Sequence, residues 1–116
     1  MKIIEKRPWG EFHILGDYED CKIKRLIVFP FHRLSLQSHE HRQEEWIVIQ
    51  GTGSAIVGNE LIDLYPHKHI TIPKTIKHRL INDHMTQNLE LIEIQVGDYF
   101  GEDDITRYED DYHRLI

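Results

Sequence analysis

The residues best suited to chemistry in this chain lie between His39 and Glu45, with a further histidine at His78. His39 and His41 are one residue apart, so on an extended strand both side chains point to the same face. One of two adjacent glutamates, Glu44 or Glu45, adds a carboxylate just beyond them. Three imidazoles and one carboxylate suit a divalent metal that keeps a position open for substrate. The spacing therefore predicts a metal site.

The composition narrows the classes of protein that are consistent with such a site. A length of 116 residues predicts one domain, over residues 1–116, with a single core. The net charge of -6 argues against nucleic acid as a partner, because a phosphate-binding surface needs an excess of basic residues. Cys21 is the only cysteine, and the chain shows neither a secretion signal at its start nor a membrane-spanning run. We therefore expect a cytoplasmic protein with no nucleic-acid or membrane partner.

Short strands must position these residues. Runs of β-type sequence separated by Gly, Pro and Asn occupy residues 10–15, 22–29, 34–41, 44–50, 54–57, 61–64, 69–72, 78–82 and 89–96. Many short strands without a helical period predict an all-β sandwich or barrel. The acidic tail, residues 101–112, is predicted to be a turn or short helix that docks Ile105, Tyr108 and Tyr112. The alternative is a flap whose Arg107 reaches the site.

Strand alternation directs further polar side chains toward the same interior. Gln37 shares a face with His39 and His41, and Glu93 and Gln95 are polar positions in an otherwise buried strand. Polar groups that face an interior need partners, so we expect these residues to line the site.

The motifs match a known family. The pattern from the first histidine pair to Gly51, followed by Pro73, His78 and Asn82, resembles the two cupin motifs. The chain more closely resembles the cupin domain of type II mannose-6-phosphate isomerases. The matching segments are Arg-Pro-Trp-Gly at 7–10, the histidine motif at 34–46, the Ile-Pro segment at 72–82 and the Glu-x-Gln-x-Gly segment at 93–107.

The resemblance implies a cupin fold, a double-stranded β-helix (jelly-roll) barrel with a short C-terminal tail. The metal ligands it implies are His39, His41, Glu44 and His78, with Glu44 chosen over Glu45 by its spacing to the glycine of the motif. The implied cofactor is a divalent ion such as Zn, Mn, Co or Ni. The chain departs from the family pattern at Phe31, which follows Pro30 where a glycine is usual, and at Thr75, which also replaces a glycine.

The implied activity is the interconversion of mannose 6-phosphate and fructose 6-phosphate. Glu93 is the candidate base, because burial on a half-apolar face should raise its pKa, and His69 is the reserve. The resemblance assigns the sugar hydroxyls to Gln37 and Gln95. The phosphate needs a cation, for which the candidates are Arg42, Arg107 and, less suitably, Lys77.

Other functions and partners also fit the sequence. One alternative is a non-catalytic, metal-containing protein that binds a sugar or sugar phosphate, and a weaker one is a metal-dependent dioxygenase. Relatives often carry a nucleotidyltransferase, but these 116 residues contain no Gly-rich phosphate loop. A small barrel with exposed edges predicts a homodimer.

Overall fold

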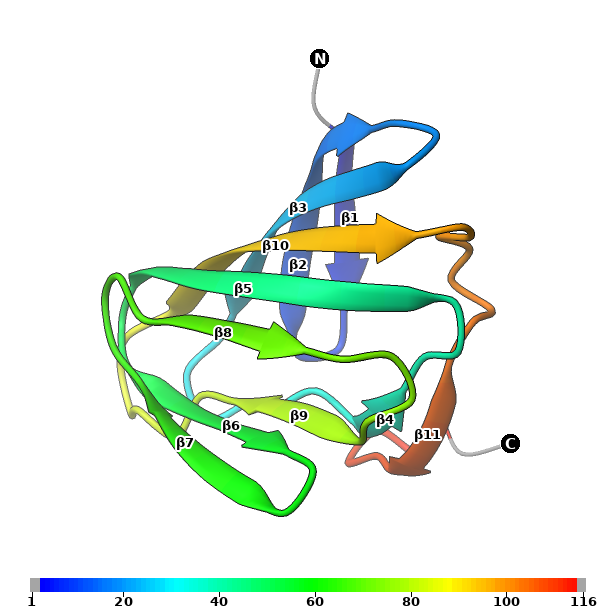
Figure 1. Ribbon diagram of the computed structural model, residues 1–116. Helices are drawn as coiled ribbons and strands as arrows, with labels where there is room; N and C mark the ends of the chain where they lie inside the picture. Colours follow the sequence, from blue (N-terminus) through cyan, green and yellow to red (C-terminus); the bar gives the residue numbers. More distant parts are fainter. Residues whose placement is uncertain (1–2, 115–116) are drawn as a thin grey trace.

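The chain folds into two antiparallel sheets that face each other (Figure 1). The computed structural model describes residues 3–114. The larger sheet has the order β1 (Ile3–Arg7), β2 (Gly10–Asp17), β3 (Cys21–Val28), β10 (Leu89–Gly97), β5 (Arg42–Gln50) and β8 (His69–Ile72). The smaller sheet has the order β11 (Thr106–Glu109), β4 (Leu36–Ser38), β9 (His78–Ile81), β6 (Gly53–Val57) and β7 (Glu60–Leu64). The predicted all-β architecture is confirmed.

The interior changes character along two central strands of the larger sheet. Every second side chain of β10 is buried, and this inward row begins with Leu89 and Leu91 but continues with Glu93 and Gln95. The antiparallel neighbour β5 shows the same change, because Val48 and Trp46 are followed inward by Glu44. One end of the space between the sheets is therefore an apolar core, and the other end is a polar pocket.

The strand predicted over residues 34–41 is shorter in the structure. β4 covers only Leu36–Ser38, and the backbone bends at 39–41 before β5 begins. Because alternation of side chains holds only while the backbone stays extended, His39 and His41 do not have to share a face. The prediction that they do was wrong, and the bend is the reason.

The tail forms a strand rather than a helix. β11 pairs with β4 in antiparallel register, with Thr106 opposite Ser38, so β4 supplies hydrogen-bond partners that a helix would have found within itself. Arg79 ties the tail to the smaller sheet, since its Nε donates to the Leu34 carbonyl at 2.8 Å and its Nη1 lies 3.1 Å from Glu109. Figure 1 shows this red segment beside β4.

The two departures from the family's glycines share a backbone conformation. Phe31 and Thr75 have φ angles of 60° and 69°, in the left-handed region that glycine adopts most easily. The Thr75 amide also donates to the His39 carbonyl at 2.8 Å, so this turn helps to fix the backbone of a candidate ligand.

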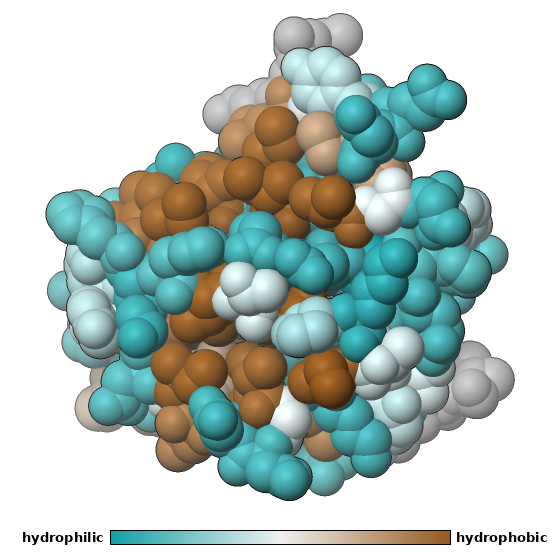
Figure 2. Space-filling model, in the orientation of Figure 1, coloured by the Kyte–Doolittle hydropathy of each residue, from teal (hydrophilic) through white to brown (hydrophobic). Residues whose placement is uncertain are grey.

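Apolar side chains also gather on the outer face of the larger sheet. Figure 2 shows them over β3 and β10, where the outward positions of β10 include Ile92, Ile94 and the exposed Val96. The homodimer expected from the sequence stays a prediction. Within residues 3–114 there is no helix of the length and apolarity that a membrane crossing requires.

Leu91 offers a direct test of the core. Its side chain is fully buried in the middle of β10, so Leu91→Ala should lower the free energy of unfolding by about 2–5 kcal/mol through lost burial and a residual cavity. Leu61→Ala is the matched control, because Leu61 is 69% exposed and should change stability by less than about 0.5 kcal/mol. Urea unfolding measures both, and equal effects would contradict the described packing.

Phe31→Gly tests the strained turn. Relief of the left-handed conformation should raise the free energy of unfolding by about 1–2 kcal/mol. The greater entropy of a glycine in the unfolded chain should lower it by about 0.5–1 kcal/mol. We expect the free energy of unfolding to rise by up to about 1 kcal/mol, since the exposed Phe31 ring loses little packing. Phe29→Gly, at a position without a positive φ, should instead be destabilising.

Candidate functional site

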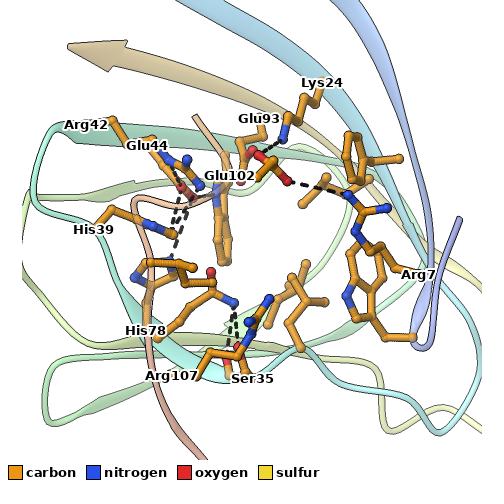
Figure 3. Close-up of a pocket in the computed structure, with 18 of the residues that line it drawn as sticks. Arg7, Lys24, Ser35, His39, Arg42, Glu44, His78, Glu93, Glu102 and Arg107 are labelled. Atoms are coloured by element: carbon orange, nitrogen blue, oxygen red, sulfur yellow. Dashed lines mark hydrogen bonds and ion pairs between the residues drawn. The ribbon is translucent and has the colours of Figure 1, made fainter. Parts of the chain in front are cut away.

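A buried carboxylate, that of Glu44, lies on one side of the polar pocket, beside Arg42 and His39 (Figure 3). Its Oε1 accepts a hydrogen bond from Trp46 Nε1 at 3.0 Å and lies 3.8 Å from His78 Nε2. Its Oε2 accepts from Arg42 Nε at 2.9 Å and lies 3.3 Å from His39 Nε2. Since Glu44 is only 2% exposed, the hydrogen bonds from Trp46 and Arg42 replace the water that a charged carboxylate loses on burial.

Both histidines next to Glu44 are oriented by backbone carbonyls. His39 Nδ1 lies 2.7 Å from the Asp104 carbonyl, and His78 Nδ1 lies 3.0 Å from the Ile76 carbonyl. A carbonyl only accepts hydrogen bonds, so each Nδ1 carries the proton and each Nε2 presents its lone pair toward Glu44. Histidine ligands of metals have this arrangement, in which one ring nitrogen is anchored and the other is free to coordinate.

The electrostatics keep these ligands in the forms that bind a cation. Burial lowers the pKa of His39 to about 4, so its imidazole is neutral at physiological pH. Burial alone would raise the pKa of Glu44, but the nearby His78, Arg42 and His39 outweigh it and hold that pKa well below the usual range. Glu44 is therefore a carboxylate under the same conditions.

The donor set fits a divalent metal. Ligand atoms of His39, Glu44 and His78 all lie within 4.8 Å of one another, and all three residues are buried. Two imidazoles and a carboxylate suit zinc and several first-row transition metals, and leave further positions for substrate. Arg42 currently neutralises Glu44, so a bound ion would share that carboxylate with the guanidinium.

His41 lies outside this cluster, which corrects the predicted set of four ligands. Its ring is half-exposed, with Nδ1 3.5 Å from Asp98 and the ring edge against Tyr99. The bend that follows β4 turns His39 inward and His41 outward. The structure therefore brings three of the four predicted metal ligands together.

Asp104, which the residue patterns did not single out, holds this bend in place. Its two carboxylate oxygens accept hydrogen bonds from the backbone amides of Glu40 and His41, each at 3.0 Å, while its carbonyl accepts from His39. Asp104 is buried, although it belongs to a run of acidic residues that looks solvated in sequence. Its place in the Gly-Glu-Asp-Asp segment of the family pattern was the only available signal.

Glu93 is the second buried carboxylate of the pocket. Burial and the neighbouring charge of Glu44 raise its pKa, as the sequence led us to expect. Gln95 donates to Glu93 Oε2 at 2.8 Å, and Lys24 stands opposite Glu93 in the pairing of β10 with β3. Gln95 is fully buried and does not line the pocket, so it orients Glu93 instead of contacting a sugar as predicted.

The remaining predicted residues divide between the pocket and the surface. Gln37, Arg42 and Arg107 line the pocket. His69, the reserve base, lies on the outer side of β8 because Ile70 and Ile72 take the inward positions of that strand. Its Nε2 contacts Glu45 at 2.9 Å on the exposed face, so the prediction for His69 was wrong.

Pattern reasoning also missed several charged residues of the pocket. Lys24 is a buried cation, and Arg7, Glu102 and Arg114 lie around it on the same wall. The Arg-Pro-Trp-Gly match contained Arg7, but nothing in the sequence placed the N-terminal strands beside the tail.

Comparison with known proteins identifies the family. A family model described as "Mannose-6-phosphate isomerase C-terminal" matches residues 2–110. The chain belongs to this family. It is 44% identical over 108 residues to the xanthan biosynthesis protein XanB of Xanthomonas campestris. It is 42% identical to the alginate biosynthesis protein AlgA of Pseudomonas aeruginosa, and 40% identical to a mannose-1-phosphate guanylyltransferase of Salmonella montevideo, each over 108 residues.

These alignments cover 93% of the length of this chain but only 22–23% of the length of each relative. The chain thus spans about a quarter of their length. The fold resembles the cupin-2 domain protein Rru_A2000 of Rhodospirillum rubrum, with a TM-score of 0.72 at 18% identity over 90% of this chain and 77% of that one. It also resembles the capsular polysaccharide assembling protein CapF of Staphylococcus aureus, with a TM-score of 0.78 at 19% identity. That match covers 94% of this chain and 33% of the CapF chain. The predicted cupin fold is confirmed.

Metal titration of single variants tests the three-ligand centre. His39→Gln and His78→Gln should weaken binding of Mn²⁺ or Zn²⁺ by more than about a hundredfold, because changes to residues that only orient ligands already cost about ten- to a hundredfold. His41→Gln should bind as the unaltered protein does. Calorimetric titration after dialysis against a chelator measures all three, and a comparable loss in His41→Gln would restore the four-ligand set.

Proposed function

We propose that this chain interconverts mannose 6-phosphate and fructose 6-phosphate. One observation carries the proposal: the buried carboxylate of Glu93 shares a pocket with the His39–Glu44–His78 cluster. Isomerisation of an aldose needs a base for a proton next to a carbonyl and positive charge for the oxygen that becomes negative. The family to which the chain belongs adds independent support.

Glu93 is proposed to move the proton. Its carboxylate takes the proton from C2 of the open-chain aldehyde. The electron pair of that C–H bond forms the C1–C2 double bond, and the C1 carbonyl pair moves to O1 to give an enediolate. The proton then returns to C1, a proton passes from O2 to O1, and the O2 electron pair forms the C2 carbonyl, so no oxidant or reductant is consumed. A base whose pKa is raised by burial suits this reversible transfer, since it must both accept and donate near neutral pH.

The neighbouring residues prepare this step. Gln95 holds Glu93 through its hydrogen bond at 2.8 Å, which limits the directions in which the carboxylate presents its lone pairs. His39, Glu44 and His78 would hold the metal ion. When bound, a divalent ion supplies Lewis-acid stabilisation of the negative oxygens of the sugar. Gln37 remains the proposed contact for a sugar hydroxyl.

A second candidate is a domain that binds a sugar phosphate without turnover. The salt bridge between Arg42 and Glu44 favours it, because a carboxylate shared with a guanidinium holds a metal ion less tightly. A protein of this kind would be stabilised against heat by the sugar phosphate yet would form no product.

Replacement of the base distinguishes the two candidates. Glu93→Gln should lower kcat for mannose 6-phosphate by at least about a hundredfold, the lower end of what a positioned proton-transfer group contributes, with metal content unchanged. Glu45→Gln is the matched control, because Glu45 bonds to His69 and Thr71 on the outer face. A coupled assay for fructose 6-phosphate with Mn²⁺, Zn²⁺, Co²⁺ or Ni²⁺ measures turnover.

Two results would contradict the isomerase proposal. One is the absence of fructose 6-phosphate with every metal supplied. The other is full activity in Glu93→Gln. Loss of metal from Glu93→Gln would instead assign Glu93 to the metal centre.

A further inference from the structure

One wall of the pocket carries more positive than negative charge. Figure 3 shows Arg7 on the side of the pocket opposite His39 and His78, with Lys24 at its upper edge and Arg107 at its lower edge. The pocket-lining carboxylate that reaches two of these cations is Glu102, whose Oε2 lies 3.2 Å from Lys24 Nζ and whose Oε1 lies 3.7 Å from Arg7 Nη2. Arg7 also pairs through Nη1 with Glu5, at 3.2 Å, which does not line the pocket.

Arg7 and Lys24 are held side by side by the same aromatic ring. The guanidinium carbon of Arg7 lies 4.8 Å from the centre of the Phe12 ring, and Lys24 Nζ lies 4.1 Å from it. Lys24 is nearly fully buried, although it is a lysine. Two cations fixed at one ring repel each other unless an anion lies between them, and Glu102 is that anion in this structure.

Arg107 is the least satisfied cation of the wall. Its Nε is buried without a hydrogen-bond partner, and within residues 3–114 no carboxylate forms an ion pair with its guanidinium. Burial and the nearby Arg114 lower its pKa, which reflects the same lack of compensating charge. A guanidinium is the group best shaped to bind a pair of phosphate oxygens, so the chemistry of Arg107 suits a phosphate.

The other candidate cations are already engaged. Arg42 is bonded through Nε to Glu44 within the metal-ligand cluster, although its Nη1 is buried without a partner among the described residues. Arg114 forms two hydrogen bonds with the carboxylate of Asp110, at 2.8 and 3.0 Å. Lys77 lies over the ring of Tyr108 and does not line the pocket. Of the cations that the sequence suggested for binding phosphate, Arg107 is therefore the best placed. The structure adds Arg7 and Lys24 as further candidates.

We propose that Arg7, Lys24 and Arg107 form a phosphate subsite, and that Glu102 occupies two of these cations until phosphate displaces its carboxylate. The assignment to a sugar phosphate rests on the proposed function. The open-chain sugar reacts at C1 and C2 and carries its phosphate on C6, at the other end of the molecule. The phosphate must therefore extend across the pocket from the metal-ligand cluster, toward the side on which Figure 3 shows Arg7, with Lys24 and Arg107 at the edges of the space between.

Binding of inorganic phosphate to the chelator-treated protein tests the subsite without turnover and without a metal that could itself bind phosphate. Arg107→Gln and Lys24→Met should each weaken phosphate binding by about tenfold or more, since hydrogen bonds to charged groups contribute about 1.5–3 kcal/mol. Glu102→Gln should tighten binding, because it removes the competing carboxylate. Lys77→Gln is the matched control and should leave the dissociation constant unchanged.

Folding is checked separately by thermal melts and by Mn²⁺ affinity, and Arg107→Lys should keep part of the phosphate affinity. Failure of the unaltered protein to bind millimolar phosphate, equal binding by Arg107→Gln and Lys24→Met, or weaker binding by Glu102→Gln would each overturn the subsite. Phosphate binding in the expected order with no fructose 6-phosphate formed would contradict the isomerase proposal and leave the subsite standing. Turnover with an unchanged KM in Arg107→Gln and Lys24→Met would contradict the subsite alone.

Discussion

The burial of one charged carboxylate determines how this pocket is built. Glu44 is inaccessible to water, and an isolated carboxylate in that position would be strongly unfavourable. Its partners come from three places: Arg42 and Trp46 from the same strand, His39 from the bend after β4, and His78 from the start of β9. Both sheets must therefore close correctly around Glu44, so the requirements of the fold and of the site coincide at this residue.

The C-terminal tail also helps to build the pocket around Glu44. The Asp104 carbonyl accepts a hydrogen bond from the His39 ring, and its carboxylate accepts hydrogen bonds from two backbone amides of the bend. Glu102 and Arg107, on either side of it in sequence, line the cationic wall of the pocket. The same short stretch of chain thus orients a proposed metal ligand and contributes residues to the wall proposed to bind phosphate. Buried Arg79 under β11 fixes that stretch to the smaller sheet.

The sequence revealed the fold and the centre of the site, but not how charges pair at its edges. Alternation identified Glu93 as an inward carboxylate, and the family motif identified Glu44, because both depend on spacing within one strand. His41 was misplaced because the backbone amides after Ser38, where the strand ends, donate hydrogen bonds to the carboxylate of Asp104, a residue distant in sequence. The cationic wall could not be foreseen either, since it joins N-terminal strands to the tail and such contacts leave no periodic pattern.

Anomalous diffraction from crystals soaked in Co²⁺ tests the central claim, that Glu44 and its two histidines form a metal centre. The account predicts one strong peak at bonding distance from His39 Nε2, His78 Nε2 and a carboxylate oxygen of Glu44, at about 2.0–2.2 Å. A peak at His41 and Asp98, or Arg42 still bonded to Glu44 with no ion between the histidines, would contradict it.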